Sequence, residues 1–189
     1  MVCLQTNLSG QNVHRQPPIL RLLSNCLSHL YHHTMSDAAP TYLVIIDGTE
    51  ESRVALRFAT MRAGHVGGRV MLLHVMRPPE FMPLGGVQAA MAAEAEAEGE
   101  ALLASHADEA ETLAGARPEL RLRCGDPASV ITEFLAGEPS VRALVLATAA
   151  KGSPGPLVSY FAGERAGQLP CVTIIVPGGL PPERLEMIS

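Results

Sequence analysis

The sequence contains no tryptophan, and aromatic residues make up only 4% of its 189 positions. A hydrophobic core must therefore be assembled from leucine, valine, isoleucine, alanine and methionine. Charged residues are also scarce at 17%, whereas hydrophobic residues reach 47%, and this balance excludes an intrinsically disordered chain. The length accommodates one α/β domain with a substantial core and leaves little room for two.

Positive charge is also in short supply. The formal net charge is -5 at pH 7, and the sequence has no cluster of lysine or arginine that would neutralise a phosphate backbone. No apolar run approaches the ~20 residues that a transmembrane helix needs. We therefore expect no nucleic-acid partner and no membrane contact, and we predict a cytoplasmic protein.

The spacing of a metal site is missing too. The four cysteines, Cys3, Cys26, Cys124 and Cys171, form no CxxC pair and have no histidine at zinc-site spacing. Cys124 and Cys171 lie in apolar, strand-like runs, where a free thiol behaves as a small hydrophobic group. We expect buried, reduced thiols and no metal site.

The first 40 residues differ in composition from the rest of the chain. Polar residues and two consecutive prolines precede a short amphipathic stretch, and the long apolar segment of a secretory signal is missing. We expect residues 1–40 to be a disordered leader, or a mis-assigned start with Met35 as the natural first residue. Residues 41–178 then form the domain, and residues 179–189 form a C-terminal tail.

From residue 41 onward, short apolar runs alternate with segments of helical periodicity. Apolar runs of this kind are typical of strands that are covered on both faces. The expected strands of this kind cover residues 42–46, 70–75, 141–147 and 171–176. Residues 120–124 alternate apolar and charged side chains, which predicts a further, half-exposed strand. The expected helices begin after Thr49, at Val87, after Asp126 and at Leu157, and the first of them ends at Gly64. This β-α alternation predicts a parallel sheet with helices on both faces.

The ends of these strands carry the candidate site. In an open parallel sheet, ligands collect at the carboxyl ends of the strands, where the strand order reverses. The candidate positions are therefore Asp47, residues 76–78, Gly125-Asp126 and residues 148–159. Asp47 ends an otherwise apolar strand, and two roles fit it: forming a turn, or contacting the polar edge of a ligand.

The loop after the fourth expected strand is rich in glycine. Gly152 and Gly155 are separated by two residues and allow a tight turn with close approach of a ligand. A helix that follows such a loop attracts anions to its N-terminus. Ser153 and Ser159 offer hydroxyl groups, and Lys151 could neutralise a phosphate. Glycine and proline also occur in such loops for geometry alone.

The catalytic motifs of common enzymes are absent. The sequence has no GxGxxG after the first strand, no GxxxxGK[ST] and no GxSxG. His74 and His106 fall on apolar faces and are expected to be core histidines with satisfied hydrogen bonds. The glutamates at alternate positions over residues 94–100 would lie on different sides of a helix rather than together, so we predict that they are exposed to solvent. We predict no catalytic residue and therefore a protein that is not an enzyme.

Several of these segments, taken together, resemble the universal stress protein family. The residues that carry the resemblance are Ile46 to Ser52 with Ala55-Leu56, Val70 to Val75, Gly125-Asp126-Pro127 with Ile131, and Cys171 to Pro177. Their order and spacing are similar to those of the family over residues 41–178.

The resemblance implies an adenine nucleotide alpha hydrolase-like fold, an open five-stranded parallel sheet of order 3-2-1-4-5 with helices on both faces. It implies a homodimer that pairs through the last strand, from Cys171 to Val176. It also implies that the ligand is ATP or another adenine nucleotide, with Mg²⁺.

Nucleotide-binding members of this family carry a glycine after the fourth strand, a second glycine after two further residues, and a third before serine or threonine. In this chain Thr148 stands at the first glycine position, and the glycines follow later in the loop. Val70 matches a pocket-lining position of the second strand. The residues that the resemblance assigns to the ligand are Asp47, Val70, Thr148, Gly152, Ser153, Gly155 and Ser159.

Three functional hypotheses follow. The first is a non-catalytic stress-response protein that binds a nucleotide or a related phosphorylated ligand. The alternative is a degenerate member that does not bind ATP and acts through dimerisation and protein partners. The third, an ATP pyrophosphatase or adenylyl transferase, needs a phosphate loop after the first strand or a histidine-containing nucleotidyl motif. Residues 47–50 supply neither.

Overall fold

The strand β1 (Thr41–Ile45) lies in the middle of the sheet, between β2 (Arg69–Met76) and β4 (Val141–Thr148). It pairs in parallel with both neighbours. The computed structural model describes residues 39–78 and 85–189, and the compact unit that holds them is Ala39–Ser189. The predicted leader therefore lies almost wholly outside the described residues.

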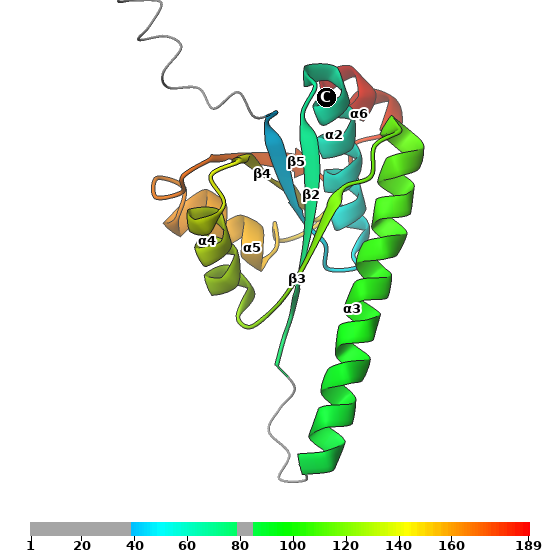
Figure 1. The fold of residues 1–189 in the computed structure, drawn as a ribbon. Helices are drawn as coiled ribbons and strands as arrows, with labels where there is room; N and C mark the ends of the chain where they lie inside the picture. Colours follow the sequence, from blue (N-terminus) through cyan, green and yellow to red (C-terminus); the bar gives the residue numbers. More distant parts are fainter. Residues whose placement is uncertain (1–38, 79–84) are drawn as a thin grey trace, which may run out of the picture. The chain divides into compact units, whose positions relative to one another are not determined.

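The other strands are β3 (Glu119–Cys124) and β5 (Val172–Pro177). The helices are α2 (Glu50–Val66), α3 (Gly85–Ala114), α4 (Pro127–Gly137), α5 (Pro156–Ser159), the π-helix η1 (Tyr160–Glu164) and α6 (Pro182–Ile188). The strand order is β3-β2-β1-β4-β5, with all pairs parallel, which confirms the predicted topology (Figure 1). Each strand lies within one residue of the bounds predicted from the sequence.

The sheet is covered on both faces. Helices α2, α3 and α6 pack on one face, where Val44 meets Leu56 of α2 and Leu103 of α3. Helices α4 and α5 pack on the other face, where Leu43 meets Ile131 of α4. Leu43 and Val44 are adjacent in β1, point into opposite layers and are both 0% exposed. This double coverage explains why β1 is apolar without alternation.

The two outer strands are less buried than the three inner ones. Cys124, at the end of β3, is exposed, and Cys171, just before β5, is half-buried. The expectation that both thiols are buried is therefore wrong, because an apolar run alone does not reveal which strands lie at the edges. Partial burial raises the pKa of the Cys171 thiol.

Helix α2 ends three residues later than the sequence predicts. Its C-cap is Gly67, with a φ of 65°, and the Gly67 N–H donates to the Ala63 carbonyl. Gly64, the predicted stop, lies inside the helix. The single helix predicted to begin at Leu157 consists of α5 followed directly by η1.

Two regions carry structure that the sequence analysis did not assign. The segment predicted as a tail contains α6, whose Leu185 is only 3% exposed in the core beneath α2 and α3. Helix α3 is 30 residues long, and Figure 1 shows that it extends past the end of β3. Its glutamates at 94, 96, 98 and 100 are exposed, as predicted, and Leu113 near its end is 48% exposed. None of the helices in the described part is both long and apolar enough to cross a membrane.

Two helical glycines provide a matched test of packing in this fold. A Cβ at Gly99 of α3 would lie 2.9 Å from Leu122 Cδ1 and 3.1 Å from the His74 ring, whereas a Cβ at Gly64 of α2 meets nothing within 4 Å. The His74 ring cannot easily move aside because its Nδ1 lies 2.6 Å from the Ile46 carbonyl oxygen.

We therefore expect Gly99→Ala to lower the free energy of unfolding by about 1 kcal/mol despite the helix propensity of alanine. The control Gly64→Ala should raise it by up to about 1 kcal/mol. Urea denaturation of the two variants measures both changes. Equal stabilisation by both would show that α3 does not pack against β2 and β3 at Gly99.

Candidate functional site

A cavity of about 640 Å³ opens at the carboxyl edge of the sheet. Its walls come from residues 45–47 after β1, residues 74–77 at the end of β2, and residues 146–147 of β4. The starts of α2, α4 and α5 complete it. The cavity therefore lies where the chain leaves β1 for one face and β4 for the other, which is the reversal point of the strand order.

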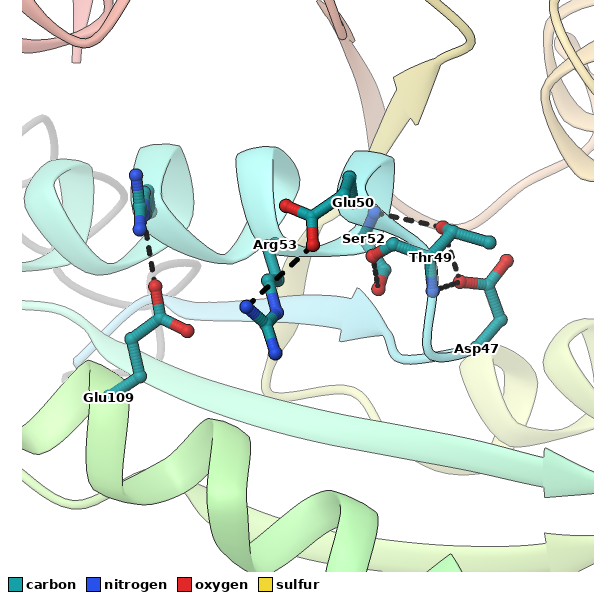
Figure 2. Close-up of polar contacts among 7 residues, drawn as sticks. Asp47, Thr49, Glu50, Ser52, Arg53 and Glu109 are labelled. Carbon is teal, nitrogen blue, oxygen red and sulfur yellow. Dashed lines mark hydrogen bonds and ion pairs between the residues drawn. The ribbon is translucent and has the colours of Figure 1, made fainter.

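Asp47 lies at the mouth of this cavity and caps the turn into α2. Its Oδ1 accepts hydrogen bonds from the Thr49 backbone N–H at 3.1 Å and the Thr49 hydroxyl at 2.7 Å (Figure 2). Thr49 is in turn the N-cap of α2, and its hydroxyl accepts from the Ser52 N–H. The turn-forming role is thus confirmed. The second carboxylate oxygen takes part in neither bond, so the role as a ligand contact stays a prediction.

A second carboxylate enters the cavity from the turn after β3. Gly125, with a φ of 148°, donates its N–H to the Met76 carbonyl, which ties this turn to the end of β2. Asp126 then caps α4, with Pro127 in the first turn of the helix, as the sequence predicts. The backbone N–H of Ser129, and then its hydroxyl, hold the pKa of Asp126 below its ordinary value, with a smaller contribution from Arg77.

The glycine-rich loop after β4 contributes less to the cavity than expected. Of its predicted ligand residues, only Gly155 lines the wall, and its φ of 93° turns the chain into α5. Thr148 lies half-buried, paired with Pro177 of β5. Gly152 is exposed in the loop. Two other predicted residues, Ser153 and Ser159, are also exposed and do not line the cavity.

Val70 is also absent from the cavity wall. It is the second residue of β2 and lies beside Tyr42 in the hydrophobic core, at the amino end of the strands. The residue of β2 that lines the cavity is Val75, because only the last residues of a parallel strand reach the carboxyl edge. The assignment of Val70 as a pocket residue is therefore corrected to Val75.

Three further side chains of the wall were not predicted. His74 accompanies Val75, and its Nδ1 contact to the Ile46 carbonyl links β2 to the end of β1. Glu51 in the first turn of α2 is half-buried, and Tyr160 enters from η1. π-helical turns are frequent at functional sites, but no pattern in the sequence predicted this one.

The second core histidine differs from expectation. The Nδ1 of His106 lies 2.8 Å from the Leu102 carbonyl oxygen, one helical turn earlier. Its Nε2 is buried and has no hydrogen-bond partner among the described residues. The prediction that both ring nitrogens of His106 have hydrogen-bond partners is therefore wrong, because only Nδ1 has one.

The cavity offers the surfaces that a nucleoside needs. Ile45, Val75 and Leu146 form apolar wall, and a flat base can be buried against such groups. Asp47 and the hydroxyl of Ser52 lie beside them and can accept or donate hydrogen bonds to ribose or base edges. In the described part of the chain, no group of three or more histidine, cysteine or acidic residues could hold a metal ion.

The sequence matches the profile of the Universal stress protein family over residues 41–177. The chain belongs to the universal stress protein family. This match covers well over half of the sequence and coincides with the sheet and its helices. Comparison with curated proteins found no significant match.

Solved structures of universal stress proteins share the fold. The protein UspA from Lactobacillus plantarum aligns with a TM-score of 0.61 and 18% identity, covering 75% of this chain and 99% of that one. A protein from Archaeoglobus fulgidus in complex with dAMP gives 0.53 and 18%, covering 75% and 99%. A protein from Arabidopsis thaliana with AMP bound gives 0.51 and 16%, covering 73% and 91%. These similarities identify the adenine nucleotide alpha hydrolase-like fold.

The cap at Asp126 makes stability depend on pH in a defined direction. Because the folded chain lowers the pKa of Asp126 below 3.8, its charged form stabilises the fold above that value. This stabilisation is lost as the pH falls through the lowered pKa. We expect Asp126→Asn to reduce the thermal midpoint at about pH 7 and to have little effect at about pH 2.

Thermal unfolding followed by circular dichroism at both pH values measures this effect. The control is Glu133→Gln, which removes the same charge from an exposed position on the same helix. A difference at Asp126 that grows on acidification would contradict the assigned role of its carboxylate.

Proposed function

We propose that this universal stress protein binds an adenine nucleotide in the cavity at the carboxyl edge of the sheet. The observation that supports this most directly is the cavity itself. It lies at the reversal point of the strand order and combines an apolar wall with the carboxylate of Asp47. Structures of the same fold are described with cAMP, dAMP and AMP, which supports the same ligand class here.

In this proposal the base packs between the ends of β2 and β4. Val75 and Leu146 supply the apolar surface, and Tyr160 extends it from η1. Asp47 accepts hydrogen bonds from the ribose hydroxyls or the base amino group through the oxygen that does not cap α2. Gly155, at the end of the loop after β4, borders the ligand. The proposed ligand class includes ATP with Mg²⁺. A cluster of protein ligands is not needed for this ion, since Mg²⁺ is commonly held by the phosphates of the nucleotide and only one or two carboxylates.

We infer a binding protein rather than an enzyme. The histidine in the wall, His74, is held by a backbone carbonyl. Within the described residues, no serine or cysteine side chain is hydrogen-bonded to a histidine ring, so an activated nucleophile has no support. A cytoplasmic location stays a prediction.

Nucleotide binding is tested directly by isothermal titration calorimetry with AMP, ADP and ATP, each with and without Mg²⁺. We expect at least one of them to bind with submillimolar affinity. Leu146→Arg, which places a charge on the apolar wall, should weaken binding by at least about tenfold, a loss of about 1.4 kcal/mol.

The control for this variant is Leu113→Arg, the same substitution at an exposed position of α3 outside the cavity. It should leave the affinity unchanged. The absence of binding by all three nucleotides at millimolar concentration would contradict the proposal and favour a member that acts through protein partners.

A homodimer through the last strand is the second part of the proposal. No described strand pairs with the outer edge of β5, and two large apolar side chains of this strand are exposed, Val172 at 62% and Ile175 at 39%. An open strand edge with exposed apolar residues favours pairing with another chain. A second copy offers the same edge and can pair with it by two-fold symmetry.

Size-exclusion chromatography with light scattering should show a dimer that Ile175→Lys converts to a monomer. Met187→Lys, at a residue of α6 that is 75% exposed, is the matched control and should remain dimeric. A monomer in the unsubstituted protein, or a dimer in Ile175→Lys, would argue against the edge as the interface.

A further inference from the structure

The described wall of the cavity carries more negative than positive side chains, which repel the phosphate groups of a nucleotide. Among the described residues, three carboxylates line it: Asp47, Glu51 and Asp126. Arg77, directly after β2, is the single arginine among the described lining residues, and none of these is a lysine. The inference that follows rests on the proposed nucleotide site and concerns how many phosphates that site accepts.

Glu51 contributes an acidic side chain to the cavity wall. It is half-buried in the first turn of α2 and takes part in none of the ion pairs among the described residues. Its Cγ lies close to Gly178, since a Cβ built on that glycine would be 3.1 Å from it. The neighbouring Glu50 is different: it is exposed, pairs with Arg53 at 3.7 Å and does not line the cavity (Figure 2).

The loop after β4 supplies few groups for an extended phosphate chain. Pro156 stands in the first turn of α5 and has no N–H, and regular α-helix continues only to Ser159 before the π-helix begins. Gly152 and Ser153 do not line the cavity. Lys151, the single lysine of the sequence, is exposed in the same loop and also lies outside the wall.

Arg77 is placed to contact one phosphate. It lies in the wall next to the turn that carries Asp126, and its charge acts on that carboxylate. One guanidinium can bind one phosphate through two parallel hydrogen bonds. Each additional phosphate brings further negative charge beside Glu51 and Asp126 without another cation to balance it.

We propose that the cavity selects adenine ligands by phosphate number: Arg77 favours a nucleoside monophosphate over the nucleoside, while Glu51 and Asp126 disfavour the triphosphate. Within the class of adenine nucleotides, AMP-like ligands with one phosphate are therefore the preferred ones. Positively charged Mg²⁺ reduces this discrimination, so it is strongest when divalent cations are removed.

The test is the affinity of adenosine, AMP, ADP and ATP for the full-length protein in EDTA, measured by isothermal titration calorimetry. We expect AMP to bind more tightly than adenosine and at least about tenfold more tightly than ATP. ATP binding as tightly as AMP would overturn this inference but not the proposed function. Binding of none of the four would overturn both.

Two pairs of variants test whether Glu51 and Arg77 cause the selectivity for phosphate number. Glu51→Gln should reduce the ratio of AMP to ATP affinity by at least about threefold, and the control Glu50→Gln should leave it unchanged. Arg77→Gln should abolish the preference for AMP over adenosine, and the control Arg53→Gln should keep it.

Thermal unfolding of all four variants verifies that each is folded before its affinities are compared. Ratios unchanged in both Glu51→Gln and Arg77→Gln would show that phosphate number is selected elsewhere, which would overturn the assignment.

Discussion

The parallel pairing of β1 with β2 on one side and β4 on the other is the constraint on which the rest of the structure depends. β1 lies between these two neighbours and carries apolar side chains on both faces, so α2 and α3 cover one side of it and α4 covers the other. The chain therefore leaves the carboxyl ends of β1 and β4 toward opposite faces of the sheet. The cavity lies between these two connections, so the position of the candidate site follows from the strand order.

The same edge concentrates the groups that end strands and begin helices. Asp47 and Thr49 cap the turn into α2, and Asp126 caps α4. Carboxylates are favoured at helix N-termini, where they accept backbone hydrogen bonds and oppose the helix dipole. Two of the helices that begin around the cavity, α2 and α4, start with such carboxylates, and these make its rim acidic. In the proposed function, the charge that stabilises the helix starts also selects among ligands.

Much of the fold could be predicted from the sequence, because four strands are short apolar runs and β3 alternates apolar and charged residues. The caps Thr49 and Asp126 were predicted correctly for a similar reason: a capping residue acts on the backbone two or three positions away. The predicted end of α2 at Gly64 was wrong, since Gly64 and Gly67 are equally suitable by residue type. Only the positive φ at Gly67 shows which of them ends the helix.

The site was harder to predict. Val70 and Val75 belong to the same apolar run, and the run alone does not indicate which of its ends lies near a ligand. The direction of the parallel strand places Val75 at the carboxyl edge of the sheet, where the cavity lies. The edge positions of Cys124 and Cys171, and the buried Leu185 of α6, depend on neighbours far away in the chain. Such contacts leave no periodic signal in a single sequence.

The sequence by itself determined the family, the five strands and the capped starts of α2 and α4, because these depend on local patterns of apolar and capping residues. The tertiary structure decided which of the candidate residues meet. It brings Asp47, Glu51, Arg77 and Asp126 to one cavity and leaves Val70, Thr148 and Ser159 outside it. The physical reason is that a cavity is formed by the ends of strands and helices from distant parts of the chain, and only packing brings those ends together.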